Sequence, residues 1–280
     1  MTKKKKDRLV ATGRYAILVL GALAVLLPVA WMIITSLKSM QDITLSKGLE
    51  LFPHGATLEN YVTIWQDYPL LTYIKNSLLS VGGSTILSVV FASLCGYGLS
   101  RFDFKGKKFL LSFLLVTQMF PAVMKIIPYY KILVSVHLHN TVAGLTIVYS
   151  SFSIPFCTWM MFGYFKTIPV TLDEAARIDG CSAFKTFLKI VLPLTIPGLV
   201  ATTIYAFLQN WNEYMFASIL MSADDKKTLT YAISTMSDSY RILWNYLMCA
   251  SIIASVPTML IFIFLQKHLI AGMTSGAVKE

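Results

Sequence analysis

Six long hydrophobic runs constrain the fold of this chain more than any other feature. They cover approximately residues 15–37, 77–99, 109–127, 141–165, 195–220 and 244–265. A helix needs roughly 20 predominantly apolar residues to cross the hydrocarbon core of a bilayer. The runs therefore predict an all-α, polytopic membrane protein with six transmembrane helices.

The composition agrees with a membrane protein. Of 280 residues, 56% are hydrophobic and only 14% are charged, whereas soluble domains carry about 25% charged residues. The net charge of +10 does not indicate nucleic-acid binding, because the basic residues cluster in short loops with few aromatic residues among them. The four scattered cysteines predict neither a disulfide framework nor a metal site, and we expect them to be small apolar residues of the interior.

The distribution of cations predicts the orientation of the spans. Most of the 24 Lys and Arg residues lie in the N-terminal segment 1–14, the turn after the second run, the loop after the fourth run and the tail 266–280. Cytoplasmic loops carry the excess of Lys and Arg, so the chain is predicted to span a prokaryotic cell membrane several times with both termini in the cytoplasm. Segment 15–37 is too long for a signal-peptide core and lacks a small-x-small cleavage site, which predicts a retained first span. Segments 38–73 and 221–243 then face outward.

A polar stretch between the fourth and fifth runs predicts a short helical docking element. Thr171 and Glu174 have the spacing of a capping box, and Gly180 suits the left-handed turn that ends a helix. Leu172, Ala175 and Ala176 would share one narrow face, where small side chains allow close approach of another backbone. Ser182 is predicted to cap a second helix, whose apolar stripe is formed by Phe184, Phe187, Leu188 and Val191.

This stretch resembles the EAA loop of ABC-importer membrane subunits. The resemblance rests on Glu174-Ala-Ala, Asp179-Gly180 and Ile190 with Leu192-Pro193. The turn Gly96–Lys108 and the ending Phe264–Glu280 are also similar to those of carbohydrate-importing, maltose-type permeases. Within residues 166–193, the resemblance implies a coupling helix that docks on a cytosolic ATPase through Leu172, Asp173, Glu174, Ala175, Ala176, Arg177, Asp179 and Gly180.

The resemblance further implies a set of partners: a homologous second permease, two ATPase subunits, an external solute-binding protein that the loop 221–243 would reach, a sugar substrate and membrane lipid. No G-x-x-x-x-G-K-[ST] phosphate loop is present, so the chain is expected not to hydrolyse ATP itself. ATP and Mg would be used by the partner ATPase, with no cofactor bound by this chain. No Ser/His/Asp or Cys/His arrangement stands out, and we expect no enzyme activity of its own.

One polar cluster inside a predicted span is a candidate for the solute pathway. It consists of Gln209, Asn210, Trp211, Asn212, Glu213 and Tyr214. Aromatic rings can stack on sugar rings, while amides and carboxylates bond to sugar hydroxyls. Helix–helix contact, or a pair between Glu213 and a cation of a partner subunit, explains the same residues equally well.

The organisation expected for the chain is a basic N-terminus (1–14), a first span (15–37), an outer loop (38–73), an importer transmembrane domain (74–265) and a tail. Three alternatives to a sugar importer remain. They are an ABC permease for another solute, an ion-coupled secondary transporter and a structural membrane anchor. An ion-coupled transporter would need several charges within the membrane, and only Glu213 lies well inside a predicted span.

Overall fold

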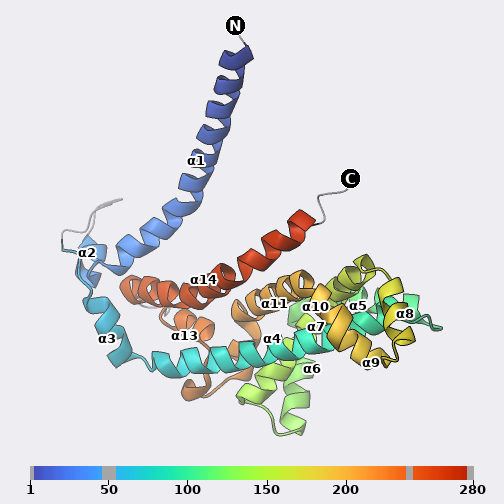
Figure 1. The fold of residues 1–280 in the computed structure, drawn as a ribbon. Helices are drawn as coiled ribbons and strands as arrows, with labels where there is room; N and C mark the ends of the chain where they lie inside the picture. The colour runs from blue at the N-terminus through green and yellow to red at the C-terminus, as the bar shows by residue number, and fades with distance from the viewer. Residues whose placement is uncertain (1–2, 46–54, 238–241, 276–280) are drawn as a thin grey trace. The chain divides into compact units, whose positions relative to one another are not determined.

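The computed structural model describes residues 3–45, 55–237 and 242–275 (Figure 1). Within these ranges the chain is helical, with no strand and one isolated antiparallel bridge between Ser237 and Ile242. The all-α prediction is confirmed. Parts of four predicted segments lie outside the described residues: 1–2 of the basic N-terminus, 46–54 of the first outer loop, 238–241 of the second outer loop and 276–280 of the tail.

Four of the described helices are long and apolar enough to cross a membrane alone. They are α1 (Lys3–Ser36), α4 (Leu70–Arg101), α7 (Val142–Thr167) and α14 (Trp244–Ser275). Two bent pairs supply the remaining candidates. α5 (Lys107–Met119) and α6 (Ala122–Ser135) meet at 99°, and the helical segment Ala183–Leu194 meets α11 (Ile196–Trp211) at 80°. Counting each bent pair as one span gives up to six, as predicted, but the second pair begins at Ala183, inside the predicted docking loop, and not at residue 195.

The predicted fifth run, 195–220, is not one helix. It consists of α11 and the short α12 (Met215–Leu220), separated by an irregular turn at residues 212–214. Likewise, the third run is interrupted at Phe120 and Pro121. Proline lacks the N–H that would continue a helix, and Phe120 adopts extended backbone angles of φ −69° and ψ 124°. Two of the six predicted spans are therefore broken.

The chain divides into two compact units, of which the first comprises residues 1–68 and 233–255. In this unit the buried side chain of Asn60, on α3 (Glu59–Asp67), joins three segments. Its amide donates hydrogen bonds of 2.8 Å to the carbonyls of Ser36 and Lys38, and its oxygen accepts one of 2.9 Å from Asn245. The end of α1 is thereby fixed to α3 and to the start of α14.

The second unit comprises residues 69–232 and 256–280. Its centre is the pair α4 and α7, which pack along each other, with α11 lying against both (Figure 1). Gly96 permits the close approach, because a Cβ at this position would lie 2.9 Å from both Met161 Cβ and the Phe162 backbone nitrogen. The buried Asn210 side chain of α11 donates to Ser84 of α4 and accepts from Ser153 of α7, each at 2.9 Å. A polar contact therefore joins all three helices.

Shorter elements attach to the two ends of α4. At its start, Tyr73 donates to the carboxylate of Asp224 (3.1 Å), and the Asn76 amide donates to the carbonyls of Asp225 and Lys227 (2.9 and 3.0 Å). These contacts fix the turn η2 (Asp224–Lys226), which precedes α13 (Leu229–Thr235). At the other end of α4 lie α8 (Thr171–Ile178) and α9 (Ala183–Thr186) (Figure 1).

Candidate functional site

The predicted docking element exists as a separate helix, but it begins differently from the prediction. The capping box is wrong: Val170 is the N-cap, Thr171 is the first helical residue, and no side chain caps this end. Instead, the amides of Asp173 and Glu174 donate to the carbonyl of Val170. The predicted end of the helix is confirmed. Gly180 has φ +81°, and the Cys181 amide donates to the Ala176 carbonyl at 2.9 Å.

The side chains of α8 separate into an inward and an outward face. Asp173 and Ala176, three residues apart, are buried. Leu172, Glu174, Ala175, Arg177, Asp179 and Gly180 are exposed, together with Ile178, which is 87% exposed. The predicted narrow face is therefore divided: Ala176 allows close packing within this chain, while Leu172 and Ala175 face away from it. Leu172 and Ala175 are therefore the residues of this face that another protein could contact.

The second helix of the loop is shorter than predicted. The Ser182 hydroxyl does accept a hydrogen bond from the Lys185 amide (3.3 Å), as expected for a cap. After α9, however, residues 187–191 form a π-helical turn, followed by α10 (Leu192–Leu194). The predicted apolar stripe is split as a result: Phe187 and Val191 are buried, whereas Phe184 and Leu188 remain exposed. Exposed apolar groups thus continue from α8 onto α9.

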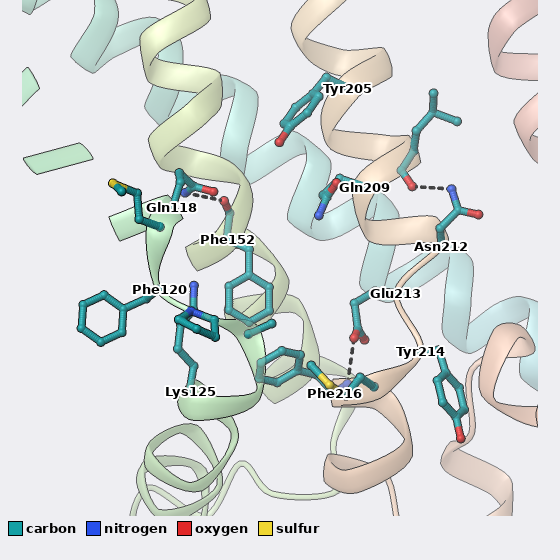
Figure 2. Close-up of a pocket in the computed structure, with 15 residues that line it drawn as sticks. Gln118, Phe120, Lys125, Phe152, Tyr205, Gln209, Asn212, Glu213, Tyr214 and Phe216 are labelled. Atoms are coloured by element: carbon teal, nitrogen blue, oxygen red, sulfur yellow. Dashed lines mark hydrogen bonds between the residues drawn. The ribbon is translucent and has the colours of Figure 1, made fainter. Parts of the chain in front are cut away.

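A cavity of about 850 Å³ lies where the two broken spans meet. Residues 118–122, at the bend between α5 and α6, line it together with Phe152 and Tyr205. Residues 212–216, which form the break after α11 and the start of α12, complete the lining. Figure 2 shows Gln118 and Lys125 on one side of this cavity and Gln209 and Glu213 on the other. Non-helical backbone is tolerated at membrane depth where it is buried in protein or lines a water-filled space. Discontinuous helices are also a frequent feature of solute sites in transporters.

Four of the six predicted pathway residues line this cavity: Gln209, Asn212, Glu213 and Tyr214. The other two face the helix bundle. Asn210 forms the buried contacts to Ser84 and Ser153 described above, and Trp211 is buried, with its ring stacked on Phe207 at 5.3 Å. For these two, the structure supports helix–helix contact.

The carboxylate of Glu213 is held by the chain's own backbone. Its two oxygens accept hydrogen bonds from the amides of Phe216 (2.8 Å) and Ala217 (3.2 Å), at the start of α12 (Figure 2). Acidic side chains stabilise the free amides of a helix N-terminus in this way. The one acidic residue predicted inside a span therefore stabilises a break in that span.

Sequence reasoning missed the contribution of Lys125, Phe152 and Tyr205 to the cavity. Lys125 follows the bend by a few residues, and its ammonium lies 5.2 Å from the centre of the Phe152 ring. Tyr205 lies one turn before Gln209 on α11. Gln118 and Pro121 inside an apolar run were the available signal. The cavity thus combines amides, aromatic faces, one ammonium and one carboxylate, a combination suited to a polar, ring-containing solute.

The sequence of this chain is similar to those of known membrane transport proteins. Residues 85–275 match the family described as "Binding-protein-dependent transport system inner membrane component". The trehalose/maltose transport system permease protein MalG of Thermococcus litoralis is 34% identical over 93% of this chain and 94% of its own length. The sulfoquinovosyl glycerol transport system permease protein SmoH of Agrobacterium fabrum is 32% identical over 91% of this chain and 89% of its own length.

A solved structure has the same fold. It belongs to a bacterial ABC transporter involved in the import of the acidic polysaccharide alginate, and it matches 95% of this chain and 98% of its own chain with a TM-score of 0.80 at 20% identity. The family match covers more than half of the chain, and the two permeases are similar along nearly their whole length. This chain belongs to the family of inner-membrane components of binding-protein-dependent transport systems.

Proposed function

We propose that the chain is a permease subunit of an ATP-driven ABC importer that moves sugars or oligosaccharides. The observation that carries the proposal is the cavity between the two broken spans, with its amides and aromatic rings. Relatives named for trehalose/maltose, sulfoquinovosyl glycerol and diacetylchitobiose transport support a carbohydrate solute. Gln118, Gln209 and Asn212 would bond sugar hydroxyls, while Phe152, Tyr205 and Tyr214 would stack on the rings.

The work for transport would come from a partner ATPase, which binds ATP with Mg. The outward face of α8, with Leu172, Glu174, Ala175, Arg177 and Asp179, would dock on that ATPase. The exposed Ile178 and Phe184 extend the same surface. Closure of the ATPase dimer on ATP would displace α8, and the spans would rock so that the cavity opens to one side of the membrane and then to the other. Hydrolysis would reset the cycle.

The assembly would contain a second permease, two ATPase subunits and an external binding protein. Both termini and the loop 166–193 would lie in the cytosol, and segments 38–73 and 221–243 outside. The expected division into a basic N-terminus (1–14), a first span (15–37), a transmembrane domain (74–265) and a tail (266–280) belongs to the same proposal. The hydrogen bonds that hold the 224–227 turn to α4 would present the outer loop to the binding protein.

The proposal is tested with the complete transporter in proteoliposomes. Uptake of a sugar that is retained by the purified binding protein should require ATP on the ATPase side, and a sodium or proton gradient without ATP should give none. Uptake driven by the gradient alone would identify a secondary transporter. An ion relay usually needs several charged groups, and Glu213 is the single carboxylate among the residues that line the cavity.

A substitution tests the docking face. Ala175→Trp should stop uptake and prevent co-purification of the ATPase, because it adds bulk to an exposed position of α8. Lys105→Trp is the control, since it places the same indole side chain on the exposed turn after α4, on the same side of the membrane under this proposal. Equal ATPase recovery and uptake for the two variants would contradict the docking role of α8.

A further inference from the structure

The inward face of α8 carries a buried carboxylate whose two oxygens are both bound by α4. The Arg101 guanidinium Nε lies 2.9 Å from one oxygen of Asp173, and the Tyr97 hydroxyl donates to the other at 2.7 Å. The side chains of Arg101 and Asp173 are only 4% and 5% exposed. Water therefore screens this ion pair little, unlike a pair at the surface. The contact joins α8 to the last turn of α4.

The same arginine also binds the end of α7. Its two terminal nitrogens donate to the backbone carbonyls of Phe165 (3.0 Å) and Ile168 (3.1 Å). The last carbonyls of a helix have no partner within the helix and carry partial negative charge. A guanidinium suits this position because its donors form a rigid, planar fork, which a lysine lacks. One side chain thus connects α4, α7 and α8.

Aromatic packing encloses this connection. The Tyr97 ring contacts Phe165 of α7 (centroids 5.6 Å apart) and Phe187 of the π-helical turn (4.8 Å). These three residues belong to a buried cluster that also includes Met161 and Val191. Both parts of the loop that follows α7 are therefore fixed to the end of α4: α8 through Asp173, and the π-helical turn through Phe187.

The two helices joined here are also those that lead to the cavity. Phe152 of α7 lines it, and Ser84 of α4 and Ser153 of α7 hold Asn210, which follows the lining residue Gln209 on α11. We propose that Arg101 is a positioning residue that makes α8 and the ends of α4 and α7 move as one body. A displacement of α8 would then move α4 and α7 by the same amount, and these helices would carry the movement to the residues that line the cavity. This inference rests on the proposed function, because it takes α8 to be the element that an ATPase moves.

The first test removes the connection without leaving a buried charge. Arg101→Met alone would leave the Asp173 carboxylate buried without its positively charged partner. We therefore choose the double variant Arg101→Met/Asp173→Leu, because apolar residues often replace a buried ion pair without loss of stability. In the assembled transporter, stimulation of ATP hydrolysis by the sugar-loaded binding protein should fall roughly tenfold or more, within the usual range of coupling between distant sites. Arg101→Lys, which keeps the charge but lacks the fork, should lie between the double variant and the unchanged chain. It also carries the test if the double variant fails to insert.

The matched control is Asp103→Asn. It removes another ion pair close to the end of α4, Asp103–Lys107 at 2.8 Å, in which the Asp103 side chain is 98% exposed. Stimulation should remain unchanged in this variant. Full stimulation in the Arg101→Met/Asp173→Leu and Arg101→Lys transporters would overturn the inference. Failure of the ATPase to co-purify with the unchanged chain would instead refute the proposed function.

A distance measurement separates positioning from general stability. Spin labels would be placed on the exposed native Cys95 of α4 and on Ile178→Cys of α8, after replacement of Cys157, Cys181 and Cys249. The distance should be narrow and unchanged between nucleotide-free and ATP-bound transporters. The double variant should broaden it or make it depend on nucleotide. Two results would overturn the inference. One is a distance that changes with nucleotide in the chain with its native Arg101 and Asp173. The other is the same narrow distribution in the double variant, since the position of α8 would then not depend on the Arg101–Asp173 ion pair.

Discussion

At Gly180, substitutions test the backbone conformation alone, because an added Cβ there would not clash with any neighbouring atom. The φ of this residue is +81°, and a Cβ there would meet no atom within 4 Å. Gly180→Ala should therefore cost about 1–2 kcal/mol through the backbone alone, weakening the end of α8 and lowering uptake. Gly180→Asn should be tolerated, because asparagine adopts this conformation more readily. Uptake assays with immunoblots of membrane fractions check both variants. Equal uptake for Ala and Asn would show that the turn conformation does not limit transport.

Two neighbouring asparagines give opposite expectations. Asn210→Ala removes the buried contacts to Ser84 and Ser153, and we expect a lower melting temperature of the purified protein, since such contacts between membrane helices contribute about 0.6 kcal/mol each. Asn212→Ala lies on the cavity side, where its amide bonds only to the Leu208 carbonyl of its own helix among the described residues. This variant should keep the melting temperature and reduce uptake. A lower melting temperature for Asn212→Ala and an unchanged one for Asn210→Ala would contradict the roles assigned to these two residues.

The polar cluster 209–214 and the loop 171–180 were readable from the sequence, but the directions of their side chains were not. Residues 209–214 formed one polar cluster by composition, yet the break after Trp211 directs Asn212 and Glu213 to the cavity, while Asn210 and Trp211 enter the bundle. Asp173 is the clearest case on α8. An acidic residue in a polar loop is usually solvated. Its buried partners Tyr97 and Arg101, 76 and 72 positions away, explain the inward orientation.

At the scale of elements, the contact between α4 and α7 depends on one of two nearby glycines. Gly96→Ala would place a Cβ 2.9 Å from the Phe162 backbone nitrogen, so the helices must separate, at a cost of about 1–3 kcal/mol. Gly98→Ala is the matched control, since nothing lies within 4 Å of its Cβ position. Alanine favours helix over glycine, so this control should keep or raise the melting temperature. Similar melting temperatures for the two variants would contradict the close packing at Gly96.

Six apolar segments followed from hydrophobicity, whereas the breaks at residues 120–121 and 212–214 did not. Proline alone does not mark a break, because Pro28, Pro155 and Pro257 lie inside the continuous helices α1, α7 and α14. At Pro121 the chain turns by 99°, and the break after α11 contains no proline at all. There, Glu213 supplies acceptors for the amides of α12. Such breaks depend on tertiary partners, which local patterns of apolar residues do not reveal.

For the whole molecule, the orientation in the membrane is open to direct measurement. A chain without its own cysteines would carry either Ile178→Cys or Asp225→Cys, both at exposed side chains. A membrane-impermeant maleimide should label position 225 in right-side-out vesicles and position 178 only in inverted ones, because cations concentrate on the cytosolic side. Labelling of both positions from one side would contradict the predicted topology and remove α8 from the reach of an ATPase.

The buried pair between Asp173 and Arg101 limits how such permeases can be recombined. A docking segment transplanted from a distant permease would arrive with its own residue at position 173, while its new host would still present Tyr97 and Arg101. A chimera with mismatched charges would bury an unpaired ion, which typically costs 3–5 kcal/mol. Exchange of ATPase specificity between transporters is therefore expected to succeed only when the last turn of α4 is inherited together with the loop.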